Sequence, residues 1–504
     1  MKNLIKIFIS LSIVFSMFSC SDDFLDKPNP NQLGEGSFYA SEVQVHQAVM
    51  GVYGQMQGIT GNQWLYSEML TDNTTVHFDE GNRGNAPNIE SFEYWQYNSG
   101  TGRMYDLYRD IYNAMGNINL TLSKLGEADI DSGEKARFEG ELRFFRAYYY
   151  FLLTQYFGDV VMITEPLTDP SAAFELERSP ISAVYTQIES DLDIAIAALP
   201  HPGNVSASDV GRLTKGAALT LSGKLWLTRK DFGKAKTALD QVAAMGYSLL
   251  GNYADVFDPT NKNHNESIFE VQFQGGNDLG EHNGFIYNFY PKFTNGEVTG
   301  FDGISGGGWN IPTLDIIGDY EDGDVRKAIS ISEGYTDKNT GEFVAIPFIE
   351  KYHYEHAIQG RPDNNWPIYR YADVLLMLAE TINEQSGPNA EAYGYINQVR
   401  DRADLLPLSG LSQDEFRTAL LHERRIELAF ENHRWFDLRR TLSATELVAL
   451  LNSHGASEKA NQTTPRGSVG FSAGDYIFDT HEILFPIPNR ERVVNPDLTQ
   501  NDGY

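Results

Sequence analysis

The sequence predicts a mostly α-helical protein in which helical hairpins form a scaffold, interrupted by one long irregular insertion with a few short strands. Apolar and aromatic residues recur at spacings of three and four through residues 104–245 and again through 366–440, as on one face of a helix. Between them, residues 246–365 lose this periodicity and are rich in Gly, Asn and aromatic residues. A long irregular stretch inside a compact domain is usually functional.

A first helix is predicted over residues 41–57, followed by a loop-rich region over 58–103. Residues 104–245 then contain two pairs of helices followed by a further helical stripe at 232–242, and the first pair is rich in tyrosine and phenylalanine. Each pair resembles a tetratricopeptide unit in size, although the literal repeat consensus is absent. We therefore expect residues 41–504 to form one domain, with helical scaffold at 41–57, 104–245 and 366–440.

The last scaffold block carries charged residues where apolar ones are expected. Ser412 and Glu415 form a predicted capping box, and Glu423 and Glu427 fall on the same helical face as Phe416. A carboxylate on an apolar face is costly unless it is paired. The block supplies many arginines, so a buried ion network is favoured over a catalytic carboxylate pair. After this block, residues 452–475 read as irregular and 483–488 as a short strand.

The N-terminus predicts export and a lipid anchor. Lys2 and Lys6 flank an apolar run within residues 1–19 that is too short for a confident bilayer span and fits a signal peptide. The only cysteine, Cys20, follows this run directly, at the position where bacterial lipoproteins are lipidated. Residues 20–40 would then be a lipidated tether. The alternative is a signal peptide followed by an incidental cysteine.

Composition and motifs exclude several classes of function. The formal net charge of −30 argues against nucleic acid as the main partner, because phosphate backbones need basic patches. His422-Glu423 lacks the second histidine of a helical zinc site, and no nucleophile elbow is present. The acidic run 319–324 fits a solvated turn better than a calcium loop. We therefore expect no catalytic residues, no metal site and no cofactor.

Three segments carry a family resemblance: RYADVLLMLAETINE at 370–384, HERRIELAFENHRWFDLRR at 422–440 and LFPIPNRERVVNPDLTQNDGY at 484–504. In this order they resemble the signature segments of the SusD/RagB family. That family usually has Gly where this chain has Asn432, and Asn is the next-best residue in a left-handed helix cap. The resemblance implies a surface lipoprotein of the outer membrane that binds a nutrient, most often a glycan, beside a SusC-like TonB-dependent transporter. Ser21-Asp22-Asp23 is similar to the acidic surface-export tag of such lipoproteins.

The loop regions 58–103 and 246–365 have the composition of a sugar-binding surface, with aromatic residues beside Asn, Asp and Arg. By resemblance to the family, Trp95 and Trp309 are expected to stack against the ligand. The expected companions are Tyr290, Asn98, Arg83 and Asp72. For Trp95, a core position at a helix entrance is an equal alternative.

Three other functions stay open at this point. RagB-like members of the family serve peptide import, and Tyr, Phe and Asp side chains suit peptides as well. A surface hydrolase could use carboxylates that no motif identifies. A scaffold could bind protein alone through its helical pairs.

Overall fold

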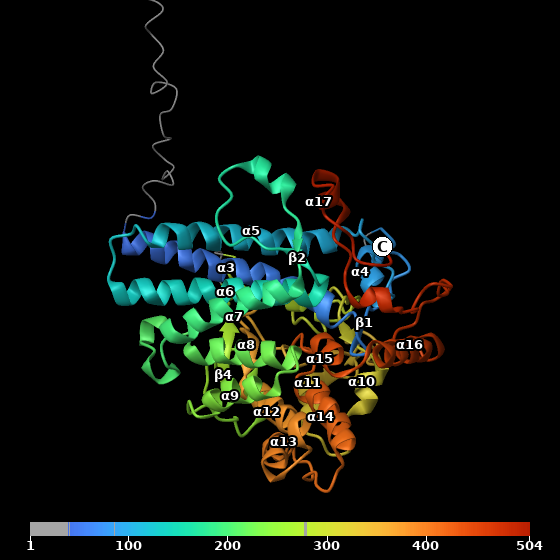
Figure 1. Ribbon diagram of the computed structural model, residues 1–504. Helices are drawn as coiled ribbons and strands as arrows, with labels where there is room; N and C mark the ends of the chain where they lie inside the picture. Colours follow the sequence, from blue (N-terminus) through green and yellow to red (C-terminus); the bar gives the residue numbers. More distant parts are fainter. Residues whose placement is uncertain (1–38, 40, 85, 277–279) are drawn as a thin grey trace, which may run out of the picture.

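The computed structural model describes residue 39 and residues 41–84, 86–276 and 280–504. The predicted signal peptide, Cys20 and nearly all of the tether lie outside these residues. The predicted mostly α-helical fold is confirmed (Figure 1). None of the helices in the described part combines the length and hydropathy needed to cross a membrane. The longer helices are α3 (Glu42–Ser67), α5 (Gly102–Leu125), α6 (Ser132–Phe157), α7 (Ile181–Ala198), α8 (Lys215–Thr228), α9 (Phe232–Ala243), α12 (Tyr371–Ser386), α13 (Ala390–Arg402), α14 (Gln413–Glu427) and α16 (Ala444–Ala460).

The helices stack side by side in chain order, as the hairpin pattern predicts. α3, α5 and α6 pack together, and α6 packs on α7, α7 on α8 and α8 on α9. α12 continues the stack against α9, and α13 and α14 pack on α12 (Figure 1). The aromatic residues of α6, among them Phe145, Tyr149 and Tyr156, are buried and form much of the core. This stack is the scaffold on which the loops are mounted.

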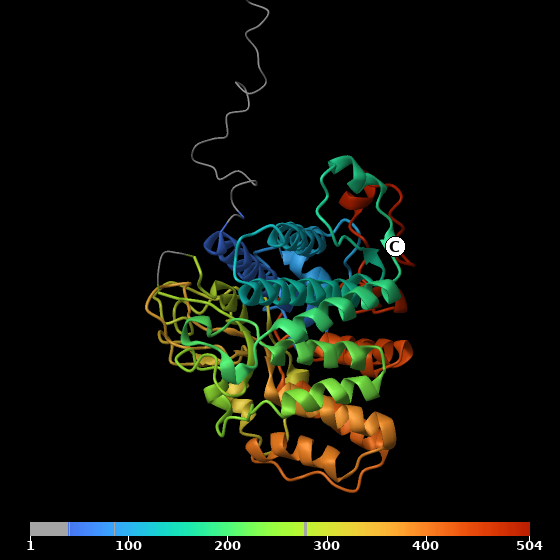
Figure 2. The same ribbon diagram turned by 60° about the vertical axis from the view of Figure 1, so that its left-hand side comes forward.

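The insertion lies along one side of the helical stack (Figure 2). Its strand β4 (Ser267–Val271) pairs antiparallel with β10 (Trp366–Arg370), which leads directly into α12. Its strand β5 (Ile311–Pro312) pairs with β1 (Thr74–Thr75), so the two predicted loop regions meet. The other short strands are β2 (Val160–Val161), β3 (Arg178–Ser179), β6 (Ile331–Ser332), β7 (Tyr335–Thr336), β8 (Phe343–Val344) and β9 (Phe348–Ile349).

Several predicted boundaries were wrong. α3 runs ten residues past the predicted end, and α4 (Ala86–Glu93) forms within the predicted loop region. The helix expected from Trp366 begins at Tyr371, because the first five residues form β10. The second half of α16, residues 452–460, lies in the segment predicted to be irregular. Residues 484–488 pair with no strand in the described part of the chain; a short 3-10 helix, η7 (Thr480–Ile483), precedes them.

The third predicted helix of the 366–440 block is broken in two. α14 ends at Glu427, α15 (Arg434–Thr441) starts seven residues later, and Phe430 and Asn432 between them have φ of 64° and 67°. The left-handed conformation expected at Asn432 is therefore confirmed. The capping box of Ser412 and Glu415 is also confirmed.

The predicted buried ion network is present at the centre of this block. Glu423 accepts hydrogen bonds from Arg326 at 2.5 Å and from Arg400 at 3.0 Å. Glu427 is bound by Arg326 at 3.0 Å and also by Arg370 and Arg402. These guanidinium groups hold the pKa of Glu427 far below its usual value, despite the burial that opposes this shift. The two glutamates thus join the last helices to the insertion and to β10.

Candidate functional site

Trp95 lies immediately after α4 and is part of the core. Its side chain is 2% exposed, and the indole Nε1 donates to the carbonyl of Leu70 at 3.1 Å. The rings of Tyr476 and Phe478 meet it edge-on at centroid distances of 5.6 and 5.3 Å. The expectation of an exposed stacking platform at Trp95 was therefore wrong, because aromatic residues from the C-terminal segment cover the ring.

Tyr290 and Asp72 are also buried, at 1% and 4% exposure. The Tyr290 hydroxyl donates to the carbonyl of Tyr352 at 3.2 Å. The Asp72 carboxylate accepts from Arg434 at 2.9 and 2.7 Å and lies 3.1 Å from Arg425, and these cations hold its pKa well below the usual value although burial opposes them. The expectation that these two side chains face a ligand was wrong, since both hold the fold together.

Trp309 is half-buried beside the β1–β5 pair. The ammonium of Lys292 lies 3.9 Å from the centroid of its ring and donates to the carbonyl of His77 at 2.8 Å. The backbone N–H of His77 in turn donates to the carbonyl of Gly308 at 2.8 Å. This bond holds the residues that follow β1 alongside the residues that precede β5. Part of the indole is thus available to a ligand, although it also carries a cation.

Arg83 and Asn98, both exposed, line one open groove of about 530 Å³. The groove runs between α4, the turn that leads into α5, and the segment 466–475 that follows α16. Trp95, Trp309, Tyr290 and Asp72 do not line it. The structure therefore brings together two of the six predicted residues and places the other four elsewhere.

Two arginines in the wall of this groove stack on one phenylalanine behind it, Phe78. The guanidinium carbon of Arg83 lies 4.6 Å from the ring centroid of Phe78, and that of Arg466 lies 4.2 Å from the same centroid. Arg466 also stacks on Phe471 at 4.2 Å and donates to the hydroxyl of Tyr94. Arg83 binds Glu90 with two hydrogen bonds of 2.8 and 2.6 Å. Stacking and pairing of this kind hold both side chains in place.

The segment 466–475 was missed as part of the site. It is joined to the α4 side by a hydrogen bond of 2.9 Å from Gln96 Nε2 to Asp475 Oδ1 and by the backbone bond from Tyr476 N–H to the Tyr94 carbonyl. The only signal in the sequence was its composition, which is polar and glycine-rich like that of the two predicted loop regions. The segment is far from Arg83 in the sequence, so no local pattern could predict that the two line the same groove.

Besides the charged side chains of Arg83, Glu90, Arg466 and Asp475, the groove presents neutral hydrogen-bonding groups around a small apolar area. Exposed amides of Asn88, Gln96 and Asn98 line it together with the hydroxyls of Ser91 and Thr101. Amides and hydroxyls both donate and accept hydrogen bonds. Such a lining suits a neutral ligand that carries many hydroxyl or amide groups.

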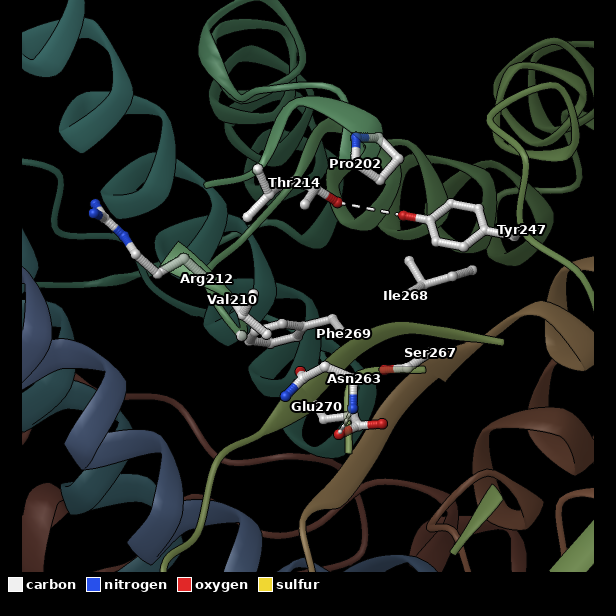
Figure 3. A pocket seen from close by; sticks show the side chains of 12 residues that line it. Pro202, Val210, Arg212, Thr214, Tyr247, Asn263, Ser267, Ile268, Phe269 and Glu270 are labelled. Atoms are coloured by element: carbon white, nitrogen blue, oxygen red, sulfur yellow. Dashed lines mark hydrogen bonds between the residues drawn. The ribbon is translucent and has the colours of Figure 1, made fainter. Parts of the chain in front are cut away.

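A smaller cavity of about 210 Å³ lies between the α7–α8 connection and β4 (Figure 3). Its charged groups already have partners: Arg212 binds Glu141 at 2.9 and 2.8 Å, and Glu270 accepts from Asn365 at 2.9 Å. The Tyr247 and Thr214 hydroxyls lie 3.4 Å apart across it (Figure 3). None of the six predicted residues lines this cavity.

Two family descriptions match the chain. The SusD family matches residues 326–504, and a family described as starch-binding and associating with the outer membrane matches residues 23–227. The SusD-like protein P25 of Formosa agariphila is 28% identical over 99% of this chain and 98% of its own length. The starch-binding protein SusD of Bacteroides thetaiotaomicron is 23% identical over 96% of both chains.

Solved structures agree with the sequence comparisons. A laminarin-binding SusD-like protein is 27% identical and superposes with a TM-score of 0.74 over 92% of this chain and all of its own. A SusD superfamily protein of Parabacteroides distasonis is 26% identical and gives a TM-score of 0.73 over 91% of this chain and 99% of its own. A SusD homologue of Bacteroides thetaiotaomicron, at 23% identity, shares the fold with a TM-score of 0.76 over 93% of this chain and 98% of its own. The chain belongs to the SusD/RagB family.

Proposed function

We propose that this chain is a surface lipoprotein that captures an oligosaccharide or polysaccharide in the groove of Arg83 and Asn98. It would then deliver the saccharide to a SusC-like TonB-dependent transporter in the outer membrane. The groove is the observation that carries the proposal, because it is open, polar and built around two of the expected site residues. The names of a starch-binding and a laminarin-binding relative support the same class of ligand.

The physical match is between the groove and a sugar ring. A sugar has an apolar C–H face and a fringe of hydroxyls, so it needs apolar contact together with neutral donors and acceptors. Tyr94, Pro87 and Val469 supply apolar surface in the groove, and the Asn, Gln and Ser side chains supply the hydrogen bonds. Trp309 does not line the groove but is proposed as a second stacking residue. It lies just before β5, which pairs with β1, and the chain runs from β1 to Arg83.

The anchor forms a second part of the proposal. Cys20 would carry the lipid, and the acidic residues after it would direct the protein to the outer face of the outer membrane. The family description that names outer-membrane association supports this location. Cys20→Ala is expected to release the protein into the soluble fraction, as followed by cell fractionation and lipid labelling. A variant that stays membrane-bound and lipid-labelled would contradict the anchor.

Calorimetry on the purified chain tests the ligand. Titrations with laminari-oligosaccharides, malto-oligosaccharides and a mixed peptide pool separate the saccharide proposal from the peptide alternative within the family. Chromatography of the same mixtures identifies a hydrolase, because products would accumulate. A protein-only scaffold would show neither binding nor products.

A pair of groove variants locates the site. Asn88→Ala combined with Asn98→Ala removes two exposed amides from the groove and is expected to weaken saccharide binding by roughly thirtyfold, since each lost hydrogen bond contributes about 1 kcal/mol. Asn113→Ala, an exposed asparagine of α5 outside the groove, is the matched control. Unchanged affinity in the double variant would place the site elsewhere.

A further inference from the structure

A second groove, of about 610 Å³, opens between the turn after α6, strand β3, helix α15 and the C-terminal segment 499–502. Its lining shares no residue with the groove of Arg83 and Asn98. Two arginines, Arg178 and Arg439, face it from different elements. Their surroundings differ from those of most arginines in this acidic chain, which pair with carboxylates.

Arg439 makes no hydrogen bond or ion pair with any residue that the structure describes. Its Nε and Nη1 are both buried without a partner, while Nη2 is the nitrogen left at the surface of the groove. A buried cation without a counter-ion is costly, because water no longer solvates it. Burial lowers the pKa of Arg439 to about 10, and the nearest ionisable groups are tyrosine hydroxyls, not carboxylates.

Arg178 is bonded to neutral oxygen atoms only, within the described residues. It donates to the carbonyls of Phe157 at 3.2 Å and Asp159 at 2.7 Å and to the side-chain oxygen of Asn501 at 2.5 Å. These bonds fix the guanidinium but leave its charge without a bonded anion. Its donors are largely occupied, so its contribution to a ligand is mainly the electrostatic field.

Two carboxylates also line the groove, and neither neutralises Arg439. Asp159 Oδ1 accepts the N–H of Ile181 at 2.8 Å at the start of α7. Asp502 is exposed and makes no ion pair among the described residues. The groove therefore keeps an unpaired guanidinium in its wall while its acidic groups are engaged elsewhere or exposed.

We propose that this second groove binds an oxyanion group, the carboxylate of a sugar acid or the sulfate ester of a sulfated sugar, on the guanidinium of Arg439. Guanidinium groups bind carboxylates and sulfates through charge-assisted hydrogen bonds, and Nη2 is the nitrogen of Arg439 placed to donate one here. The exposed hydroxyls of Thr480 and Thr499 border the groove and suit the rest of such a ligand, whereas the Gln500 amide is held by the backbone of Ile487 and Asn501. That the oxyanion belongs to a saccharide rests on the proposed function, whereas the binding of the oxyanion itself does not.

The test titrates the purified chain with sodium glucuronate, sodium sulfate and glucose at matched ionic strength, followed by calorimetry and by melting temperature. We expect saturable binding of glucuronate or sulfate and none of glucose at this groove. Binding of glucuronate alone identifies a carboxylate ligand, and binding of sulfate alone identifies a sulfate ester. If neither binds the unmodified chain, the proposal is wrong. It is also wrong if glucose binds and its affinity falls in Arg439→Gln as much as theirs does, whereas glucose binding that Arg439→Gln leaves unchanged belongs to the groove of Arg83 and Asn98.

Variants assign the binding to Arg439. Arg439→Gln is expected to weaken binding of the anion roughly tenfold to a hundredfold, and Arg439→Lys to weaken it less, because it keeps a charge. Arg229→Gln removes an exposed arginine that lines neither groove and should leave binding unchanged. Equal anion affinity in all three variants would overturn the assignment. The double variant Asn88→Ala, Asn98→Ala should bind neutral saccharide more weakly and bind the anion as before. The two proposals can therefore fail independently of each other.

Discussion

Arg439 and Arg440 are consecutive residues of helix α15 with opposite electrostatic surroundings. Arg440 binds Glu380 with two hydrogen bonds of 2.8 and 2.7 Å and Asp437 with another of 3.0 Å. Arg439 has no carboxylate partner in the described part of the chain and faces the second groove. Arg440 therefore stabilises the scaffold, and Arg439 keeps its charge for a ligand.

Arg440→Met should destabilise the protein far more than Arg439→Met. Loss of Arg440 leaves Glu380 as a buried carboxylate without its counter-ion, which costs about 3–5 kcal/mol. Loss of Arg439 removes a half-buried charge that had no bonded partner among the described residues, so the free energy of unfolding should stay the same or rise. Chemical denaturation of both variants measures the difference. Equal losses would mean that Arg439 has a stabilising partner in solution.

Trp95→Ala should mainly lower stability, whereas Trp309→Ala should mainly lower glycan binding. Trp95 is enclosed by Tyr476 and Phe478, so its truncation should lower the free energy of unfolding by about 3–5 kcal/mol. Trp309 is half-buried, so its truncation should leave the melting temperature nearly unchanged and abolish glycan retention in affinity electrophoresis. Retention by the Trp309 variant would confine the saccharide to the groove of Arg83 and Asn98.

Periodicity predicted the scaffold well, because side chains at spacings of three and four decide which face of a helix is buried. It failed where tertiary packing overrode local signals. α3 continues through Gly58 and Gly61, residues that normally weaken a helix, because Trp64, Tyr66 and other residues beyond them are buried in the core. α16 was missed because its buried face includes His454 and Glu458, so the apolar stripe is short.

The candidate site was only partly predictable for a similar reason. Composition identified the loops that carry Arg83 and Asn98, and these do line one groove. Whether Trp95 is exposed depends on Tyr476 and Phe478, which are about 380 residues away in the sequence. No local pattern around Trp95 encodes that contact. The lack of a carboxylate partner at Arg439 could not be predicted either, because two consecutive arginines, Arg439 and Arg440, do not show from sequence which one is paired.

The buried network around Glu427 should be essential for stability. Glu427→Gln removes one of the carboxylates shared by Arg326, Arg370 and Arg402 and leaves this buried cluster one negative charge short, which should cost about 3–5 kcal/mol. Glu333→Gln is the control, because the Lys327–Glu333 pair is exposed and such pairs contribute about 0–1 kcal/mol. Denaturation by urea measures both losses. Similar small losses would show that the network adds little to stability.

Stability should fall between about pH 5 and pH 8 because of Glu93. Its side chain is buried, accepts hydrogen bonds from Thr75 and Tyr476, and has its pKa raised to about 8 by that burial, with Glu90 and Glu458 adding to the shift. In the unfolded chain the same carboxyl has its ordinary pKa near 4.5. The folded state therefore holds a proton that the unfolded state loses, and the stabilisation from this group is complete below the unfolded pKa and disappears as pH rises through the folded value.

Glu93→Gln should flatten this dependence, because an amide does not titrate. The free energy of unfolding of the unmodified chain should fall by about 1 kcal/mol per pH unit more than that of the variant. The quantity to follow is the difference in the free energy of unfolding between the two proteins. Either curve alone also contains Glu68 and Glu482, whose pKa values are raised to about 7 by burial and which titrate in the same pH window. Parallel curves for the two proteins would mean that Glu93 is ionised in the folded state throughout. That would require water or a cation beside Oε2, which has no hydrogen-bond partner among the described residues.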